Sequence, residues 1–146
     1  MDTIKKSKNL FIDGPIPPVF IADSIAKHST KTNIGAHAIF LGQVRADTKD
    51  GRAVTAIHYS AYSPMAEQIM AHMRESFFAQ YNDMTCLHIY HSLGQVKAGE
   101  ISLFVFVSCR HRQQSFKALE HIVDQLKAGL PVWKQEFYED DSYQWV

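Results

Sequence analysis

The alternation of hydrophobic and polar residues changes its period twice between residues 101 and 136. Residues 101–107 form a nearly continuous hydrophobic run, rich in β-branched and aromatic side chains, which is typical of a strand covered on both faces. A helix is predicted next, because hydrophobic residues then recur three and four positions apart. Gly129 and Pro131 should end this helix, and beyond Pro131 a period of two predicts another strand. The expected hydrophobic stripe of the helix is Phe116, Leu119, Ile122, Val123 and Leu126.

The rest of the chain predicts a similar mixture of strands and helices. Strands are expected at residues 10–12, 35–44, 54–62 and 85–92, a short helix at 17–28, and a turn from Gly94 to Gly99. Asp50-Gly51 between two strands is a hairpin signal. Ser63 is expected to cap a second helix that begins at Pro64. Its predicted hydrophobic stripe is Met65, Ile69, Met73 and Phe77.

These elements indicate one α+β domain over residues 1–146, with a mixed, largely antiparallel sheet. A chain of this length buries roughly 68–70% of its unfolded surface, so a substantial core is expected. Residues 1–9 are polar and are expected to be disordered.

Charge and composition narrow the function classes. Fifteen basic and fifteen acidic side chains give no net charge, which argues against nonspecific nucleic-acid binding. No segment is long and apolar enough to be a signal peptide or a membrane span. Cys86 and Cys109 form no CxxC pair and are expected to be buried free thiols, so a cytoplasmic location is expected.

Several kinds of catalytic site have no sequence signature here. His88 and His91 are three apart in a predicted strand and should point to opposite faces, and there is no HExxH motif. We therefore expect no metal site. Glycine-rich phosphate loops and a GxSxG nucleophile motif are also absent from the sequence.

Five cationic residues form the candidate site. They follow strands or lie near the end of the predicted helix: Arg45, His111, Arg112, Lys127 and Lys134. Guanidinium groups suit phosphate and carboxylate recognition, and two neighbouring lysines disfavour each other's charge, which favours a neutral amine. The chemistry predicted is anion binding with proton transfer or amine nucleophilicity. Taken singly, the same residues also fit solvated surface cations, and Lys127 fits a cation at a helix end.

The sequence of these segments resembles that of the large, catalytic subunit of molybdopterin synthase. The resemblance runs from about residue 35 to residue 145 and rests on an ordered set of motifs. These are Gly42-Gln43-Val44-Arg45, Tyr59-x-Ala61-Tyr62-x-x-Met65, His91-x-x-Gly94, Gly99-Glu100, His111-Arg112, Lys127 and Pro131-x-Trp133-Lys134-x-Glu136. Ser60 stands where family members often carry an acidic residue. The resemblance implies an α/β-hammerhead fold with an additional β-subdomain.

The resemblance also implies a reaction and partners. Members of this family convert cyclic pyranopterin monophosphate to molybdopterin, with two sulfurs from the C-terminal thiocarboxylate of a small ubiquitin-like subunit. By position, Lys127 and Lys134 would be catalytic, and the substrate would be bound by Arg45, Phe40, His111, Arg112 and Glu136. The family needs no further cofactor. It forms a homodimer of large subunits within a heterotetramer, and both protomers contribute to each pocket.

Two other functions remain compatible with the sequence. One is a noncatalytic dimeric module that docks a ubiquitin-like tail. The other is a structural α+β dimer whose basic residues are only solvated surface, which a structure with the five cations on separate faces would favour.

Overall fold

The computed structural model describes residues 10–146, so the expectation for residues 1–9 lies outside the described part of the chain. The elements that follow one another are β1 (Phe11–Asp13), α1 (Pro18–Lys27), η2 (His28–Thr30), β2 (Ala36–Gln43), β3 (Thr48–Lys49), β4 (Arg52–Ala61), α2 (Ser63–Gln80), β5 (Met84–Lys97), β6 (Ile101–Cys109), α3 (Arg112–Gly129), β7 (Val132–Tyr138) and β8 (Tyr143–Trp145). The predicted α+β class is confirmed. Among residues 10–146, strand pairing is antiparallel except between β1 and β5, so the mixed, largely antiparallel sheet is confirmed as well.

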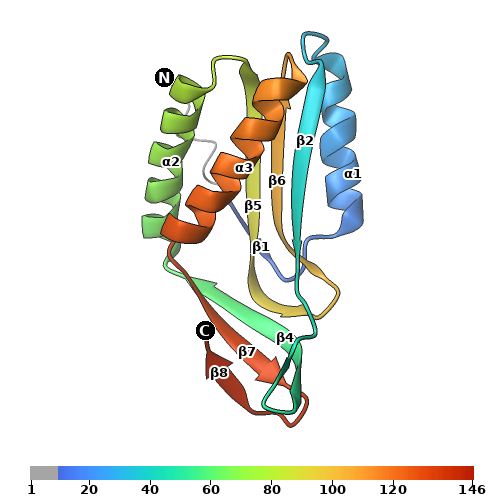
Figure 1. Cartoon of the computed structure of the whole chain (residues 1–146), viewed down its shortest axis with the longest axis vertical. Helices are drawn as coiled ribbons and strands as arrows, with labels where there is room; N and C mark the ends of the chain where they lie inside the picture. The colour runs from blue at the N-terminus through green and yellow to red at the C-terminus, as the bar shows by residue number, and fades with distance from the viewer. Residues whose placement is uncertain (1–9) are drawn as a thin grey trace.

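The larger part of the molecule is a sheet with helices on both faces. Strand β6 lies between β2 and β5, and β1 pairs with β5. Figure 1 shows α2 and α3 side by side over one face, with α1 beside the far side of β2. The hydrophobic run of β6 is buried along nearly its whole length, as predicted for a strand covered on both faces.

Alternation along the strands produces two cores. Val105 and Val107 of β6 point to the face that α2 and α3 cover, and they pack with Met70 of α2 and Ile122 of α3. The intervening Phe104 and Phe106 point to the opposite face and pack with Ile21 of α1 and its neighbours. The two faces of the sheet therefore carry separate hydrophobic cores.

A second, smaller group of strands extends from the end of the helical part. Strands β4, β7 and β8 pair in order, and the far half of β5 pairs with β4 from Gly94 to Lys97. The turn predicted from Gly94 to Gly99 was wrong, because β5 continues to Lys97. Gly94 has a φ of +86°, which glycine adopts readily and residues with a Cβ atom rarely do. This backbone conformation lets β5 bend from one sheet into the other without ending.

Two details of the helices differ from the prediction. Helix α2 begins at Ser63 and its cap position is Tyr62, so Ser63 does not cap it. Its buried residues are Ala66, Met70 and Phe77, whereas Met65 is 39% exposed. Phe116 of α3 is 64% exposed, because small Ser115 and Ala118 make the close contact instead. Among the described helices, none is long and apolar enough to cross a membrane.

Candidate active site

Lys127 and Lys134 lie on either side of the link between α3 and β7. Lys127 is in the last turn of α3, and Lys134 pairs with Tyr59 of β4 in the smaller group of strands. The last turn of α3 is closed by the Leu130 N–H, which donates to the Leu126 carbonyl oxygen at 3.0 Å. Figure 1 shows this end of α3 next to the start of β7, where the two parts of the molecule join.

The pKa of Lys127 is lowered, first by burial of its ammonium and then by the positive charges of Lys134 and Arg45. These three of the five candidate cations are therefore close enough for their charges to interact. Lys127 as a residue remains exposed, so solvent partly screens the two neighbouring charges. A lysine of lowered pKa has a larger fraction of neutral amine near neutral pH, as proton transfer or nucleophilic attack requires.

Arg45 and His91 complete the group at this junction. Arg45 follows Val44, whose N–H and carbonyl bond to Glu100 and Gly99, and its guanidinium lies 3.1 Å from an Asp47 carboxylate oxygen. The pKa of His91 is lowered by burial and by the charges of Lys127 and Lys134. Because its lowered pKa favours the neutral form, this partly buried imidazole beside two lysines is a candidate proton acceptor. His91 was recognised in a motif but not as a site residue, because its neighbours come from distant segments.

His111 and Arg112 lie at the opposite end of α3. His111 is the cap residue of α3, and Asp83 holds it, accepting from the backbone N–H at 2.7 Å and contacting Nδ1 at 3.2 Å. Arg112 begins the helix that carries Lys127 near its end, about 22 Å away at 1.5 Å per residue. The expectation that Arg45, His111 and Arg112 converge is therefore wrong within a single chain.

The other two predicted residues occupy different surroundings. Phe40 of β2 is partly buried and packs against the core beneath α2 and α3. Glu136 of β7 is 9% exposed; its Oε1 accepts from Lys49 Nζ at 2.7 Å and from the Tyr138 hydroxyl at 3.1 Å. Glu136 thus holds the β3–β4 hairpin against β7, and its role in binding substrate stays a prediction.

The coupling between the two lysines is testable by titration. We expect Lys134→Gln to raise the pKa of Lys127, because it removes one positive charge that disfavours the ammonium. NMR titration of the lysine side-chain nitrogens should therefore show the Lys127 midpoint at higher pH in the variant. Lys117→Gln, which removes an exposed charge from the same helix, should leave that midpoint unchanged. Equal midpoints in Lys134→Gln and the wild type would mean that the two amines do not interact.

The structure is thus an α+β domain with a group of cationic side chains where its two parts join, an arrangement with the chemistry to bind an anion. The comparisons make this specific. The sequence profile of the family described as MoaE protein matches residues 18–129. This chain belongs to the MoaE protein family.

Curated relatives carry the name molybdopterin synthase catalytic subunit. The protein from Nostoc sp. is 34% identical over 112 residues, which span 77% of this chain and 67% of that protein. The protein from Drosophila willistoni is 39% identical over 112 residues, which span 76% of this chain but only 30% of that longer protein.

Solved structures agree with the fold. Molybdopterin synthase from Staphylococcus aureus has a TM-score of 0.82 at 27% identity, covering 95% of this chain and 96% of that chain. A protein-protein complex of subunits 1 and 2 of molybdopterin-converting factor from Helicobacter pylori has a TM-score of 0.76 at 19% identity, covering 94% of this chain and 88% of that chain.

Proposed function

We propose that this chain is the catalytic subunit of a molybdopterin synthase and acts as a sulfurtransferase. In this reaction, two sulfurs from the C-terminal thiocarboxylate of a small ubiquitin-like subunit convert cyclic pyranopterin monophosphate to molybdopterin. The observation that carries the proposal is the grouping of Lys127, Lys134 and Arg45 at the junction, with the pKa of Lys127 lowered. Membership of the MoaE protein family supports the same reaction.

Each residue of the junction has a role in this proposal. Lys127 transfers a proton or acts as an amine, because its lowered pKa favours the neutral form. Lys134 orients the anionic substrate from β7, where a strand position fixes its backbone. Arg45 contributes a guanidinium for the phosphate. Phe40 and Glu136 retain their proposed places in the substrate pocket. No metal or organic cofactor takes part in this scheme.

The remaining anion-binding residues come from a second protomer in this proposal. His111 and Arg112 are too far from Lys127 to act on the same substrate within one chain, so a homodimer supplies them in trans. A surface suited to such a dimer is the aromatic face of β7 and β8. In these paired strands Trp133, Phe137, Tyr143 and Trp145 share one face by register and alternation. Trp133, Tyr143 and Trp145 are each about half exposed, which is unusual for so much aromatic surface.

A small ubiquitin-like subunit is the partner in this scheme, with a heterotetramer as the full assembly. The two-subunit complex from Helicobacter pylori supports such a partner. A cytoplasmic location is part of the same proposal, because Cys86 and Cys109 are free thiols, as expected in a reducing compartment.

A reconstitution assay tests this function against a docking module without chemistry. The purified chain is incubated with cyclic pyranopterin monophosphate and a thiocarboxylated small subunit from a related synthase. We expect a dithiolene product, and none when the carrier ends in an ordinary carboxylate. Binding of the thiocarboxylated carrier without any product would favour the noncatalytic module and contradict the proposal.

A further inference from the structure

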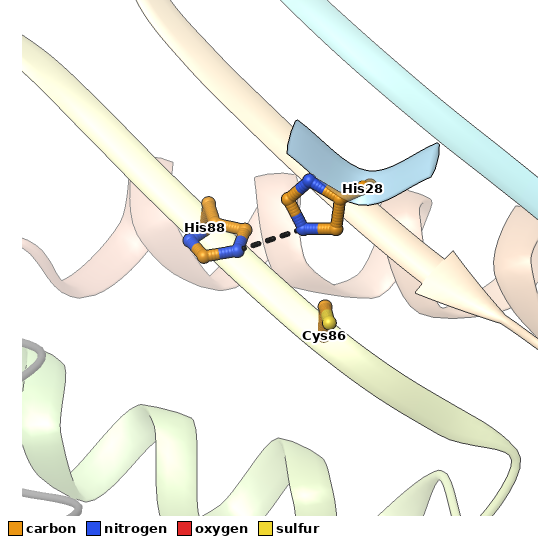
Figure 2. A group of neighbouring side chains, drawn as sticks. All are labelled: His28, Cys86 and His88. Atoms are coloured by element: carbon orange, nitrogen blue, oxygen red, sulfur yellow. Dashed lines mark hydrogen bonds between the residues drawn. The ribbon is translucent and has the colours of Figure 1, made fainter. Parts of the chain in front are cut away.

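Two histidines and a cysteine meet on the α1 face of the sheet, away from α2 and α3. Cys86 and His88 are two residues apart on β5, so their side chains point to the same face. His28 begins η2, directly after α1, and its Nε2 lies 3.1 Å from Nε2 of His88. One ligand atom from each of the three residues lies within 4.8 Å of the others. Figure 2 shows the two imidazole rings joined through their Nε2 atoms, with the sulfur of Cys86 nearby.

The His28 ring is fixed in an orientation that suits a ligand. Its Nδ1 lies 2.7 Å from the Ser24 carbonyl oxygen, which can only accept, so Nδ1 carries the hydrogen. Nε2 of His28 therefore presents its lone pair to His88 and Cys86. A histidine held at one nitrogen by a backbone carbonyl is the usual arrangement in metal sites, because the hydrogen bond sets the tautomer and the ring angle.

The surroundings of the three residues are mostly closed. His28 is 7% exposed and Cys86 is 8% exposed. The centroid of the Phe106 ring lies 4.7 Å from that of the His28 ring, so Phe106 covers the cluster on the side of the sheet. Lys31 donates from Nζ to Cys86 Sγ at 3.2 Å, and its charge would offset that of a metal-bound thiolate. The His37 ring lies 6.0 Å from the His28 ring, centroid to centroid, and the Nδ1 of His37 is hydrogen-bonded to Ser108 Oγ at 2.8 Å.

We propose that His28, Cys86 and His88 bind one zinc ion. Two imidazole nitrogens and a thiolate are ligand types that Zn²⁺ prefers. In a tetrahedral zinc site with Zn–N bonds of about 2.0–2.1 Å and a Zn–S bond of about 2.3 Å, the ligand atoms lie about 3.3–3.6 Å apart. The two Nε2 atoms lie 3.1 Å apart here, and the sulfur lies within 4.8 Å of both. Three protein ligands leave one position for water. On binding, the ion replaces the thiol proton of Cys86, which passes to solvent, and the hydrogen on Nε2 of His88 is exchanged for one on its Nδ1, so both imidazoles bind as neutral ligands.

This site is separate from the proposed catalytic junction. Cys86 and His88 face α1, whereas Lys127 lies at the end of α3, on the other face of the sheet. The zinc ion would add a covalent link between the end of α1 and β5, beside the hydrogen bond between His28 and His88 and the contact between the Phe20 and Tyr90 rings. The inference does not depend on the proposed sulfur transfer.

Metal titration of the full chain, carrying no histidine tag, tests the site. Co²⁺ serves as a coloured probe for zinc, because cobalt bound to a thiolate gives a charge-transfer absorption in the near ultraviolet. We expect this absorption to saturate at one Co²⁺ per chain and to be abolished by one equivalent of Zn²⁺. Mg²⁺ should not displace Co²⁺, because it prefers oxygen ligands.

Substitutions decide whether these three residues are the ligands. Cys86→Ser should abolish the charge-transfer absorption, and Cys86→Ser or His28→Gln should weaken Zn²⁺ binding at least about tenfold in a chelator competition. His72→Gln, at an exposed histidine of α2, and Cys109→Ala, at the other cysteine, should bind as the wild type does. If His28→Gln does not fold, His88→Gln replaces it. Absence of one-to-one binding, or an unchanged spectrum in Cys86→Ser, would overturn the proposal.

Discussion

Replacing Lys127 with alanine is expected to slow product formation about 10²–10⁴-fold, the usual cost of losing an acid-base group. Dimerisation and binding of the small subunit should be unchanged. As a mere cation at a helix end, Lys127 would contribute only about 0.3–1 kcal/mol to stability, and its loss would leave turnover intact. Its lowered pKa at the junction with Lys134 and Arg45 favours the catalytic role. Single-turnover assays with thiocarboxylated carrier give the rate, and thermal unfolding gives the stability.

Lys127→Arg separates charge from proton transfer. Arginine keeps the positive charge but does not lose a proton in proteins, so this variant should also be slow. Lys134→Ala should be slow to a smaller degree, because its strand position suits orientation of the substrate. Lys117→Ala, at an exposed position on the same helix, is the matched control and should turn over normally. Full turnover by Lys127→Arg would reduce Lys127 to an electrostatic support.

The sequence predicted the positions of helices and strands best where the hydrophobic residues keep one spacing over many positions. The buried run of β6, the helix that ends at Gly129 and the two-residue period of β7 are all present at the predicted places. The Asp50-Gly51 turn is present too, with positive φ angles at both residues. Local chemistry decides such features, because strand alternation, helix caps and tight turns depend on neighbours in the chain.

Predictions failed where a distant segment decides the outcome. Gly94 suggested a turn by its residue type, but pairing with β4 keeps β5 extended through it. In α2 the periodicity favoured the larger Met65 and Ile69, but the helix presents small Ala66 to the core. A small residue at the contact lets a helix approach its neighbours closely, and hydrophobicity alone does not reveal which face does so.

In the candidate site, too, contacts between residues close in the sequence were predictable, whereas contacts between distant segments were not. Lys127 and Lys134 are separated by one short link, so their proximity could be predicted from the helix end and the strand that follows. His91 joins them only because β5 bends from one sheet into the other beside the end of α3. His28 is 60 residues from His88, so no spacing rule for metal ligands could connect them. The separation of Arg112 from Lys127 follows from the length of α3, whose first residue is Arg112 and whose start the sequence pattern did not predict.

That separation leads to a prediction about mixed dimers. If one site uses Lys127 of one protomer and Arg112 of the other, a dimer of one Lys127→Ala chain and one Arg112→Ala chain has one intact site. Purified mixed dimers, selected by two different tags, should therefore regain about half of the wild-type turnover, whereas each variant alone is nearly inactive. The tags also allow light scattering to verify that the species assayed is a dimer.

The reciprocal pairing distinguishes sites shared between protomers from sites within one chain. A wild-type chain paired with a Lys127→Ala/Arg112→Ala double variant has no intact shared site, because each site then lacks one of the two residues. It should be nearly inactive. If both residues instead served a site of their own chain, this second dimer would keep about half of the turnover and the first would have almost none. The roughly 22 Å between the two positions along α3 favours the shared arrangement.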